Sequence, residues 1–167
     1  MARWLLVASL LCLSLSTTAA APSKCAGAEY HRLDFWLGDW DTFNPDGSGP
    51  SQARNRVTSI LDGCAIHERY EQTDGLKGES FSIYDGSRRV WHQTWVTNSG
   101  TLLVLEGRFD GEALTLVGSN LDAHGKPQIV RVIWKQQCKG VRETAYISRD
   151  GGKSWNDYFD ILFLPHH

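Results

Sequence analysis

Residues 90–120 read VWHQTWVTNSGTLLVLEGRFDGEALTLVGSN, and their pattern is the clearest indication of the fold class. It holds three runs rich in β-branched and aromatic residues, at 90–97, 101–109 and 112–120, separated by Asn98-Ser99-Gly100 and Asp110-Gly111. Such runs predict strands, and glycine and asparagine tolerate the positive φ of tight hairpin turns. The stretch therefore predicts three antiparallel strands joined by two short turns.

The same pattern of runs and turns extends in both directions along the chain. From residue 34 onward a turn signal interrupts an apolar run roughly every eight to twelve residues, which is typical of β-sandwiches and barrels. The strands are expected at 37–43, 53–61, 65–72, 78–84, 90–97, 101–109, 112–120, 128–136, 141–148 and 155–163. Short turns make consecutive strands antiparallel neighbours, and closure removes exposed edges. We therefore predict an all-β fold, a single antiparallel up-and-down β-barrel of about ten strands, with a two-sheet sandwich as the alternative.

The N-terminal segment has the pattern of a cleavable secretory signal. Arg3 precedes an apolar run at 4–15, and small residues follow it. The run is shorter than the roughly 20 apolar residues that a membrane span needs. We expect 1–20 to be a signal peptide, 21–32 an N-terminal extension and 33–165 the barrel domain. The mature protein would then be secreted or periplasmic and not membrane-anchored, whereas a buried N-terminal helix is the alternative.

The charge balance argues against a nucleic-acid partner. The chain of 167 residues carries 17 basic and 19 acidic residues. Removal of the signal takes Arg3 away and leaves 16 basic residues against 19 acidic ones, a net charge of −3 with neutral histidines. Nucleic-acid binding depends on clustered lysines and arginines that neutralise phosphates. The composition indicates no oligomeric state.

Three cysteines follow the signal, namely Cys25, Cys64 and Cys138. In an oxidising compartment this odd number predicts one disulfide and one free thiol. We favour a bridge between Cys25 and Cys64, because it would tie the N-terminal extension to the barrel. Closing a loop of about 40 residues would contribute roughly 4 kcal/mol in the chain-entropy model. Three free thiols are the alternative.

Two aromatic motifs carry a resemblance to a known family. Residues 33–40 read LDFWLGDW, in which Gly38 stands two residues before Trp40, and residues 91–96 read WHQTWV. With an F-W-x-G-x-W opening and a W-x-Q-x-W-V motif, the chain resembles a family of uncharacterised bacterial exported domains with a lipocalin-like, calycin-type barrel. The resemblance implies a short helical lead-in, a tight entry into the first strand at Gly38 and a Trp40 indole that closes the barrel floor. It implies no established activity.

A third motif lies near the C-terminus. Residues 148–155 read SRDGGKSW, which fits the S-x-D-x-G-x-S-W pattern known as an Asp-box. We expect Asp150 to accept backbone N–H groups across the turn that begins at Ser148. Gly152 should take a backbone conformation that residues with a side chain rarely adopt, and Trp155 should pack beneath the hairpin. We interpret the motif as structural.

Strand alternation predicts a candidate ligand site, because residues two apart in a strand share a face. Trp91, Gln93 and Trp95 share one face of the strand at 90–97, and Glu68 and Tyr70 share one face of the strand at 65–72. Apolar and aromatic walls with a few directional polar groups are typical of ligand sites. A filled core in which these side chains satisfy one another is an equally good interpretation.

Arg131 is a further candidate. If it faces inward, its guanidinium would pair with Glu68 or with an anionic ligand. If it faces outward, it is a solubilising charge, and the alternation along 128–136 does not decide between the two. A haem-binding barrel would need one inward histidine, for which His92 is the nearest candidate.

Searches for catalytic and metal motifs return no match. The sequence holds no G-x-S-x-G elbow, no H-E-x-x-H and no C-x-x-C pair. We therefore expect no catalytic residue, no metal and no cofactor, and we predict an exported module that binds a small hydrophobic or amphipathic molecule. One alternative is an enzyme with Glu68 as general acid or base and Arg131 or Tyr70 holding an anionic intermediate. Another is an interaction protein that uses the outside of a filled barrel.

Overall fold

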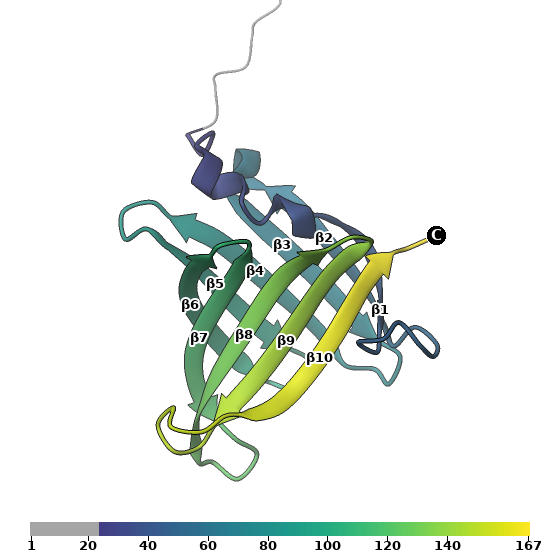
Figure 1. The fold of residues 1–167 in the computed structure, drawn as a ribbon, viewed down its shortest axis with the longest axis vertical. Coiled ribbons are helices and arrows are strands. Elements are labelled where there is room, and N and C mark those ends of the chain that lie inside the picture. Colours follow the sequence, from purple (N-terminus) through teal and green to yellow (C-terminus); the bar gives the residue numbers. More distant parts are fainter. Residues whose placement is uncertain (1–23) are drawn as a thin grey trace, which may run out of the picture.

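The computed structural model describes residues 24–167, so the predicted signal peptide at 1–20 lies outside the described residues. The described part contains ten strands, β1 (Gly38–Phe43), β2 (Ala53–Ile60), β3 (Ala65–Gln72), β4 (Lys77–Asp85), β5 (Val90–Thr97), β6 (Leu102–Asp110), β7 (Ala113–Leu121), β8 (Pro127–Gln137), β9 (Gly140–Ser148) and β10 (Asn156–Pro165) (Figure 1). Two short 3-10 helices, η1 (Ala28–His31) and η2 (Asp34–Trp36), precede β1, and η3 (Leu61–Gly63) joins β2 to β3. No helix in this part of the chain is long and apolar enough to cross a bilayer.

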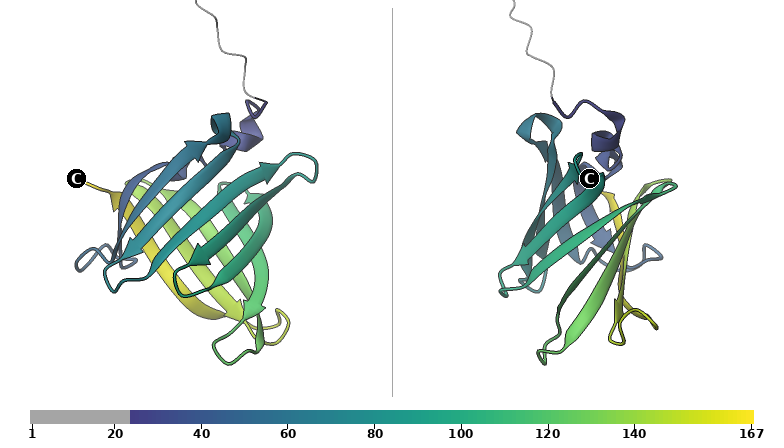
Figure 2. Two further views of the ribbon diagram at one scale, coloured as in Figure 1. Left: turned by 180° about the vertical axis from the view of Figure 1, so that it is seen from behind. Right: turned by 90° about the vertical axis from the view of Figure 1, so that its left-hand side faces the viewer.

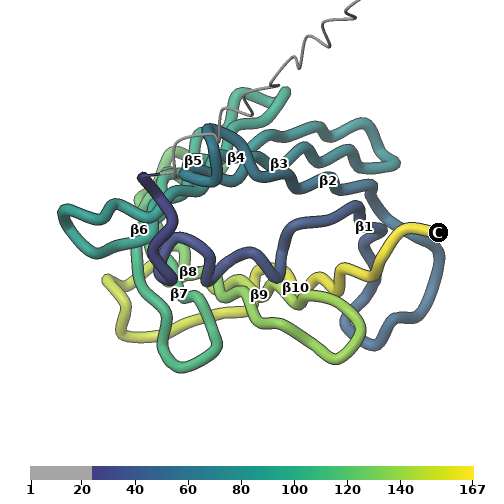
Figure 3. Tube along the Cα trace, turned by 90° about the horizontal axis from the view of Figure 1, so that it is seen from above, coloured from purple at the N-terminus to yellow at the C-terminus, as the bar shows by residue number. Residues whose placement is uncertain are grey.

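The strands form a closed antiparallel barrel. Each strand pairs with its neighbours in sequence, and β10 pairs with β1 to close the ring. Figure 3 shows the trace passing once round the barrel, with the C-terminus beside β1. The predicted up-and-down barrel and its helical lead-in are confirmed, and the structure excludes the sandwich. Every predicted strand boundary lies within two residues of the observed one.

Tryptophans close the end of the barrel next to η2. Trp36 is fully buried and packs on Trp134 and Phe163, with ring centroids 5.9 and 6.4 Å away. Trp40 Nε1 donates a hydrogen bond to the Trp36 carbonyl oxygen at 3.0 Å. The Trp40 indole lies so close to Gly38 that a Cβ there would meet ring atoms at 2.8 Å. The glycine therefore lets the indole fold back over the start of β1 and complete a closed floor.

A disulfide joins the N-terminal extension to this closed end. Cys25 is bonded to Cys64, which follows η3, and Cys138 is a free, exposed thiol. The predicted pairing is confirmed. The bridge holds η1 and η2 against the barrel and so keeps the buried Trp36 in place in the floor.

The opposite end of the barrel is wider, because two pairs of neighbouring strands are hydrogen-bonded over only part of their length. β6 pairs with β7 only from Glu106 to Asp110, and β10 pairs with β1 only from Leu162 to Pro165. The right-hand view of Figure 2 shows the green and yellow strands β7–β10 diverging from the teal strands toward this end. The barrel is thus a wedge made of a first half, β1–β6, and a second half, β7–β10, which meet at the tryptophan floor.

The residues of the Asp-box motif form a tight turn between β9 and β10. Asp150 Oδ1 accepts the backbone N–H groups of Lys153 and Ser154, both at 2.9 Å, and the Ser148 hydroxyl at 2.8 Å. Gly152 has φ +90°, and its carbonyl oxygen accepts the Trp155 indole N–H at 3.2 Å. Hydrogen bonds, first that of the Ser154 hydroxyl, lower the pKa of Asp150 to about 2. All of these groups serve the turn itself.

Candidate functional site: a cavity inside the barrel

A cavity of about 380 Å³ lies inside the barrel where the two halves diverge. Its lining combines apolar side chains from β6 and β8 with polar side chains from β3, β5 and β9, namely Leu105, Val130 and Val132 with Glu68, Gln93 and Glu143. The core is therefore not completely filled. The strand ends near Gln72 and Thr101 form its rim, at the end of the barrel farthest from the tryptophan floor.

Four of the six predicted ligand-binding residues line this cavity, namely Glu68, Tyr70, Gln93 and Trp95. Trp91 faces inward but lies deeper in the core, where it packs on Tyr84 and Phe109 with ring centroids 6.0 and 6.2 Å away. The structure thus brings together both strands of the predicted site and assigns Trp91 to packing beneath it.

Arg131 does not line the cavity. Val130 and Val132 on either side of it are buried and face inward, so the alternation of β8 turns Arg131 outward. There its guanidinium lies over the Trp155 ring, with Cζ 3.7 Å from the ring centroid. The interpretation in which Arg131 faces inward and pairs with Glu68 is therefore wrong.

His92 also lies on the outside of the barrel. Its Nδ1 is 3.1 Å from a Glu106 carboxylate oxygen and its Nε2 is 2.8 Å from the Thr94 hydroxyl. Both ring nitrogens are engaged in surface contacts, so His92 is not an inward haem ligand. Among the described residues, no group of three or more histidine, cysteine, aspartate or glutamate side chains is arranged to hold a metal.

Glu68 is the centre of a buried polar cluster. Its side chain comes from β3, and neighbouring strands supply donors to both carboxylate oxygens. Asn55 Nδ2 donates to Oε1 at 3.0 Å, and the Ser80 hydroxyl donates to Oε2 at 2.6 Å. Only 5% of the residue is exposed, and burial raises the pKa of Glu68 to about 7, although both hydrogen bonds act in the opposite direction. Its partners are all neutral, so nothing in the cluster balances a negative charge.

Glu143 is the main site residue that the sequence analysis missed. It faces inward from β9 and lines the same cavity. Glu143 is partly exposed, but to the cavity and not to the outer surface. Its carboxyl is therefore still removed from bulk water. Burial, followed by the negative charge of Glu68, raises the pKa of Glu143 well above its usual range. A signal was present in the sequence, because Glu143 stands two residues from Val141 and Ala145 and so shares the face of β9 that these buried residues occupy.

Aromatic rings line the outer part of the cavity. Tyr70 and Trp95 meet edge to face with centroids 6.0 Å apart, and Tyr158 and Phe159 approach from β10. Trp95 lies flat enough over Gly78 that a Cβ there would meet the indole at 2.2 Å. Burial raises the pKa of Tyr70 to about 12, so its phenol is neutral. The cavity therefore combines two inner carboxyl groups with an aromatic entrance.

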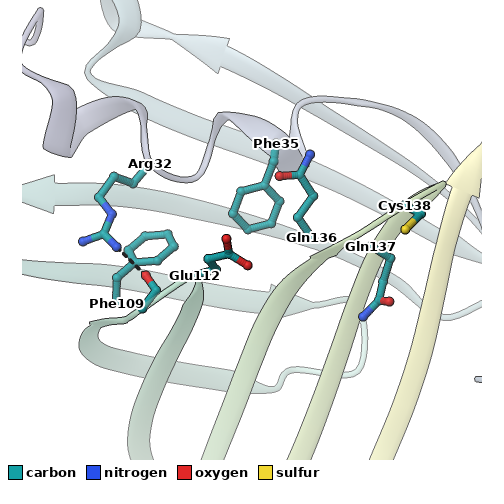
Figure 4. A pocket seen from close by; sticks show the side chains of 8 residues that line it. Arg32, Phe35, Phe109, Glu112, Gln136, Gln137 and Cys138 are labelled. Atoms are coloured by element: carbon teal, nitrogen blue, oxygen red, sulfur yellow. Dashed lines mark hydrogen bonds between the residues drawn. The ribbon is translucent and has the colours of Figure 1, made fainter.

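Two of the larger hollows lie outside the barrel. One of about 510 Å³ at the closed end is lined by Arg32, Phe109, Glu112 and Cys138 among others (Figure 4). Arg32 is already occupied there, because it donates to the Gly111 carbonyl oxygen at 2.7 Å and stacks on Phe109. The other, of about 620 Å³, lies among turns at the wide end. Both are lined largely by exposed residues, whereas several buried polar groups converge in the barrel cavity.

Comparison of the chain with protein-family models and with curated proteins gave no match.

Proposed function

We propose that this chain is an exported binding protein whose barrel holds a small hydrophobic or amphipathic molecule. The observation that carries the proposal is the cavity of about 380 Å³, whose lining includes the buried Glu68 of the polar cluster and the apolar side chains of Leu105, Val130 and Val132. Ligand sites are typically concave, about 300–1,000 Å³ in volume and mainly apolar with a few placed polar groups. The cavity has these properties, and its aromatic entrance suits a ligand with an apolar body.

Two features support export. The Cys25–Cys64 disulfide is a kind of bond that persists in oxidising compartments. The sequence at 1–20 has the order of charged, apolar and small residues that signal peptidases process. The contact between Gly38 and Trp40 also supports the proposed membership of a lipocalin-like exported family.

A fluorescence titration with a blocked variant tests the binding function. Trp95 is the one tryptophan of the described residues that lines the cavity, so a bound ligand should change the emission. In Val132→Phe the larger ring would extend into the cavity and abolish the response. Val117→Phe is the matched control, because this exposed valine lies on the outside of β7. A ligand library that gives no response, or equal responses from both variants, would refute the proposal.

Catalysis by Glu68 is the second candidate function. The observation that favours it is a buried carboxyl that keeps its proton near neutral pH and borders an accessible cavity, as a general acid requires. Arg131 cannot assist, so Tyr70 is the remaining partner. Hydrolysis of chromogenic esters and glycosides by the wild type, lost in Glu68→Gln, would support this function. Equal rates for both proteins would exclude it.

A further inference from the structure

The cavity has an unbalanced set of charges. Three carboxyl groups, Glu68, Glu143 and Asp160, line it, and its described lining contains no lysine, arginine or histidine. Asp160 is balanced from the outside, because Arg142 Nε donates to its Oδ1 at 2.8 Å. Glu68 and Glu143 form no ion pair within residues 24–167. The inner cavity therefore presents two carboxyl groups without a basic partner.

A buried carboxylate is costly unless a cation or a proton neutralises it. Asn55 and Ser80 stabilise the Glu68 carboxylate only as neutral donors, and within residues 24–167 no hydrogen bond reaches the Glu143 carboxyl. In the empty cavity the least costly solution near neutral pH is for the pair to retain a proton. A cationic group between the two side chains would replace that proton and stabilise both carboxylates.

The rest of the cavity suits an apolar body attached to such a cation. Strand β3 begins at the closed end, so Glu68 lies deeper in the barrel than Tyr70, which follows it. A ligand that enters cation first would place its apolar part among Tyr70, Trp95 and Phe159 near the entrance. Aromatic faces attract both apolar groups and organic cations.

We propose that the ligand is an organic cation, an ammonium group carried on an apolar and preferably aromatic body, with the ammonium held between Glu68 and Glu143. This inference rests on the proposed binding function and specifies its ligand class. When the ammonium enters, the proton retained by the pair leaves to solvent, so the net charge of the two carboxyl groups and their neutralising cation stays at −1. Three other titratable groups line the cavity: the Tyr70 phenol stays neutral, Asp160 is paired with Arg142, and Tyr158 is an exposed residue at the entrance.

Isothermal titration with four probes of matched shape tests the ligand class. The probes are 4-phenylbutylamine, 4-phenylbutyltrimethylammonium, 4-phenyl-1-butanol and 5-phenylpentanoate, each titrated at pH 7 in two buffers that differ in ionisation enthalpy. We expect the amine to bind roughly ten- to a hundredfold more tightly than the alcohol, as for hydrogen bonds to charged groups. The pentanoate should not bind. The heat should differ between the buffers, because a proton is released.

Two variants and one control locate the effect. Glu68→Gln and Glu143→Gln should each reduce the preference for the amine over the alcohol about tenfold and leave binding of the alcohol intact. Glu71→Gln should change nothing, because Glu71 is exposed on the outside of the same strand and pairs with Lys77. For wild type, the affinity for the trimethylammonium probe should rise toward about tenfold per pH unit between roughly pH 6 and 8 while one proton is released.

The outcomes separate the inference from the function on which it rests. If the alcohol binds as tightly as the amine, or both glutamine variants keep the full amine preference, the ligand class is wrong and the binding function stands. If none of the four probes binds, the binding function fails and the inference fails with it. Far-ultraviolet circular dichroism of each variant shows whether a lost preference comes from the site or from unfolding.

Discussion

Replacing Glu68 by glutamine should change how the stability of the protein depends on pH. Burial raises the pKa of Glu68 from 4.5 to about 7. Between these two values the folded state holds a proton that the unfolded chain has lost, so the stability of the wild type falls as pH rises through this window. One pKa unit corresponds to about 1.4 kcal/mol, so the shift amounts to about 3 kcal/mol above pH 7.

The glutamine side chain has the shape of the protonated acid and no charge at any pH. Its oxygen can still accept from Asn55 Nδ2, and its amide can donate to the Ser80 hydroxyl, so the cluster keeps its hydrogen bonds. The variant should therefore match the wild type below pH 4.5, gain stability relative to it as pH rises, and be more stable by up to about 3 kcal/mol at pH 8. Glu143 shifts in the same direction, so Glu143→Gln should add to the effect.

Urea denaturation at pH 5, 6, 7 and 8, followed by near-ultraviolet circular dichroism, measures this difference. Glu71→Gln is the control, because it removes one exposed carboxylate from the outside of β3 and should shift stability equally at every pH. A Glu68→Gln variant that is less stable than the wild type by the same amount at pH 5 and pH 8 would refute the reasoning. That result would mean that the carboxyl is ionised and well solvated in the folded protein.

Three further predictions concern the frame around the cavity. Cys25→Ser should lower the free energy of unfolding by about 4 kcal/mol in urea, because it opens the loop closed by Cys64, and an unchanged midpoint would contradict this. Gly78→Ala should cost about 1–3 kcal/mol and alter tryptophan emission, because the new methyl group displaces Trp95; unchanged emission would place the indole elsewhere. Asp150→Ala should speed amide exchange in the turn between β9 and β10, whereas unchanged protection would show that the turn holds without this carboxylate.

The fold could be predicted from the sequence because its signals are local. Each turn is marked in the sequence by turn-forming residues such as Gly100 and Gly111. Their observed φ values of +80° and +57° are those that glycine tolerates best. Because every connection between strands is short, consecutive strands must be antiparallel neighbours in the sheet. The remaining question is then whether the sheet closes into a barrel. The partial pairing of β6 with β7 has no such local signal, so the wedge shape and the cavity that it opens were not predictable.

The site was predictable only where one face of a strand differs clearly from the other. On β3, Ile66 and Tyr70 share a face with Glu68, whereas His67 and Arg69 occupy the other, so the more apolar face indicates the inward side. On β8 both faces are mostly apolar, and the outward direction of Arg131 depends on packing against β7 and β9. Glu143 is recognisable as a site residue only once the fold places it in the same cavity as Glu68, which lies on a distant strand.

The position of a bound ligand shows whether the barrel cavity is the binding site. With 4-phenylbutylamine added to protein labelled with ¹³C at its methyl groups, ligand-to-protein nuclear Overhauser effects show which methyl groups the ligand touches. We expect contacts to Leu105 and Val132, which line the cavity, and none to Val104 and Val117, which are exposed on the outside. Contacts to Val104 or Val117 in place of Leu105 and Val132 would contradict it.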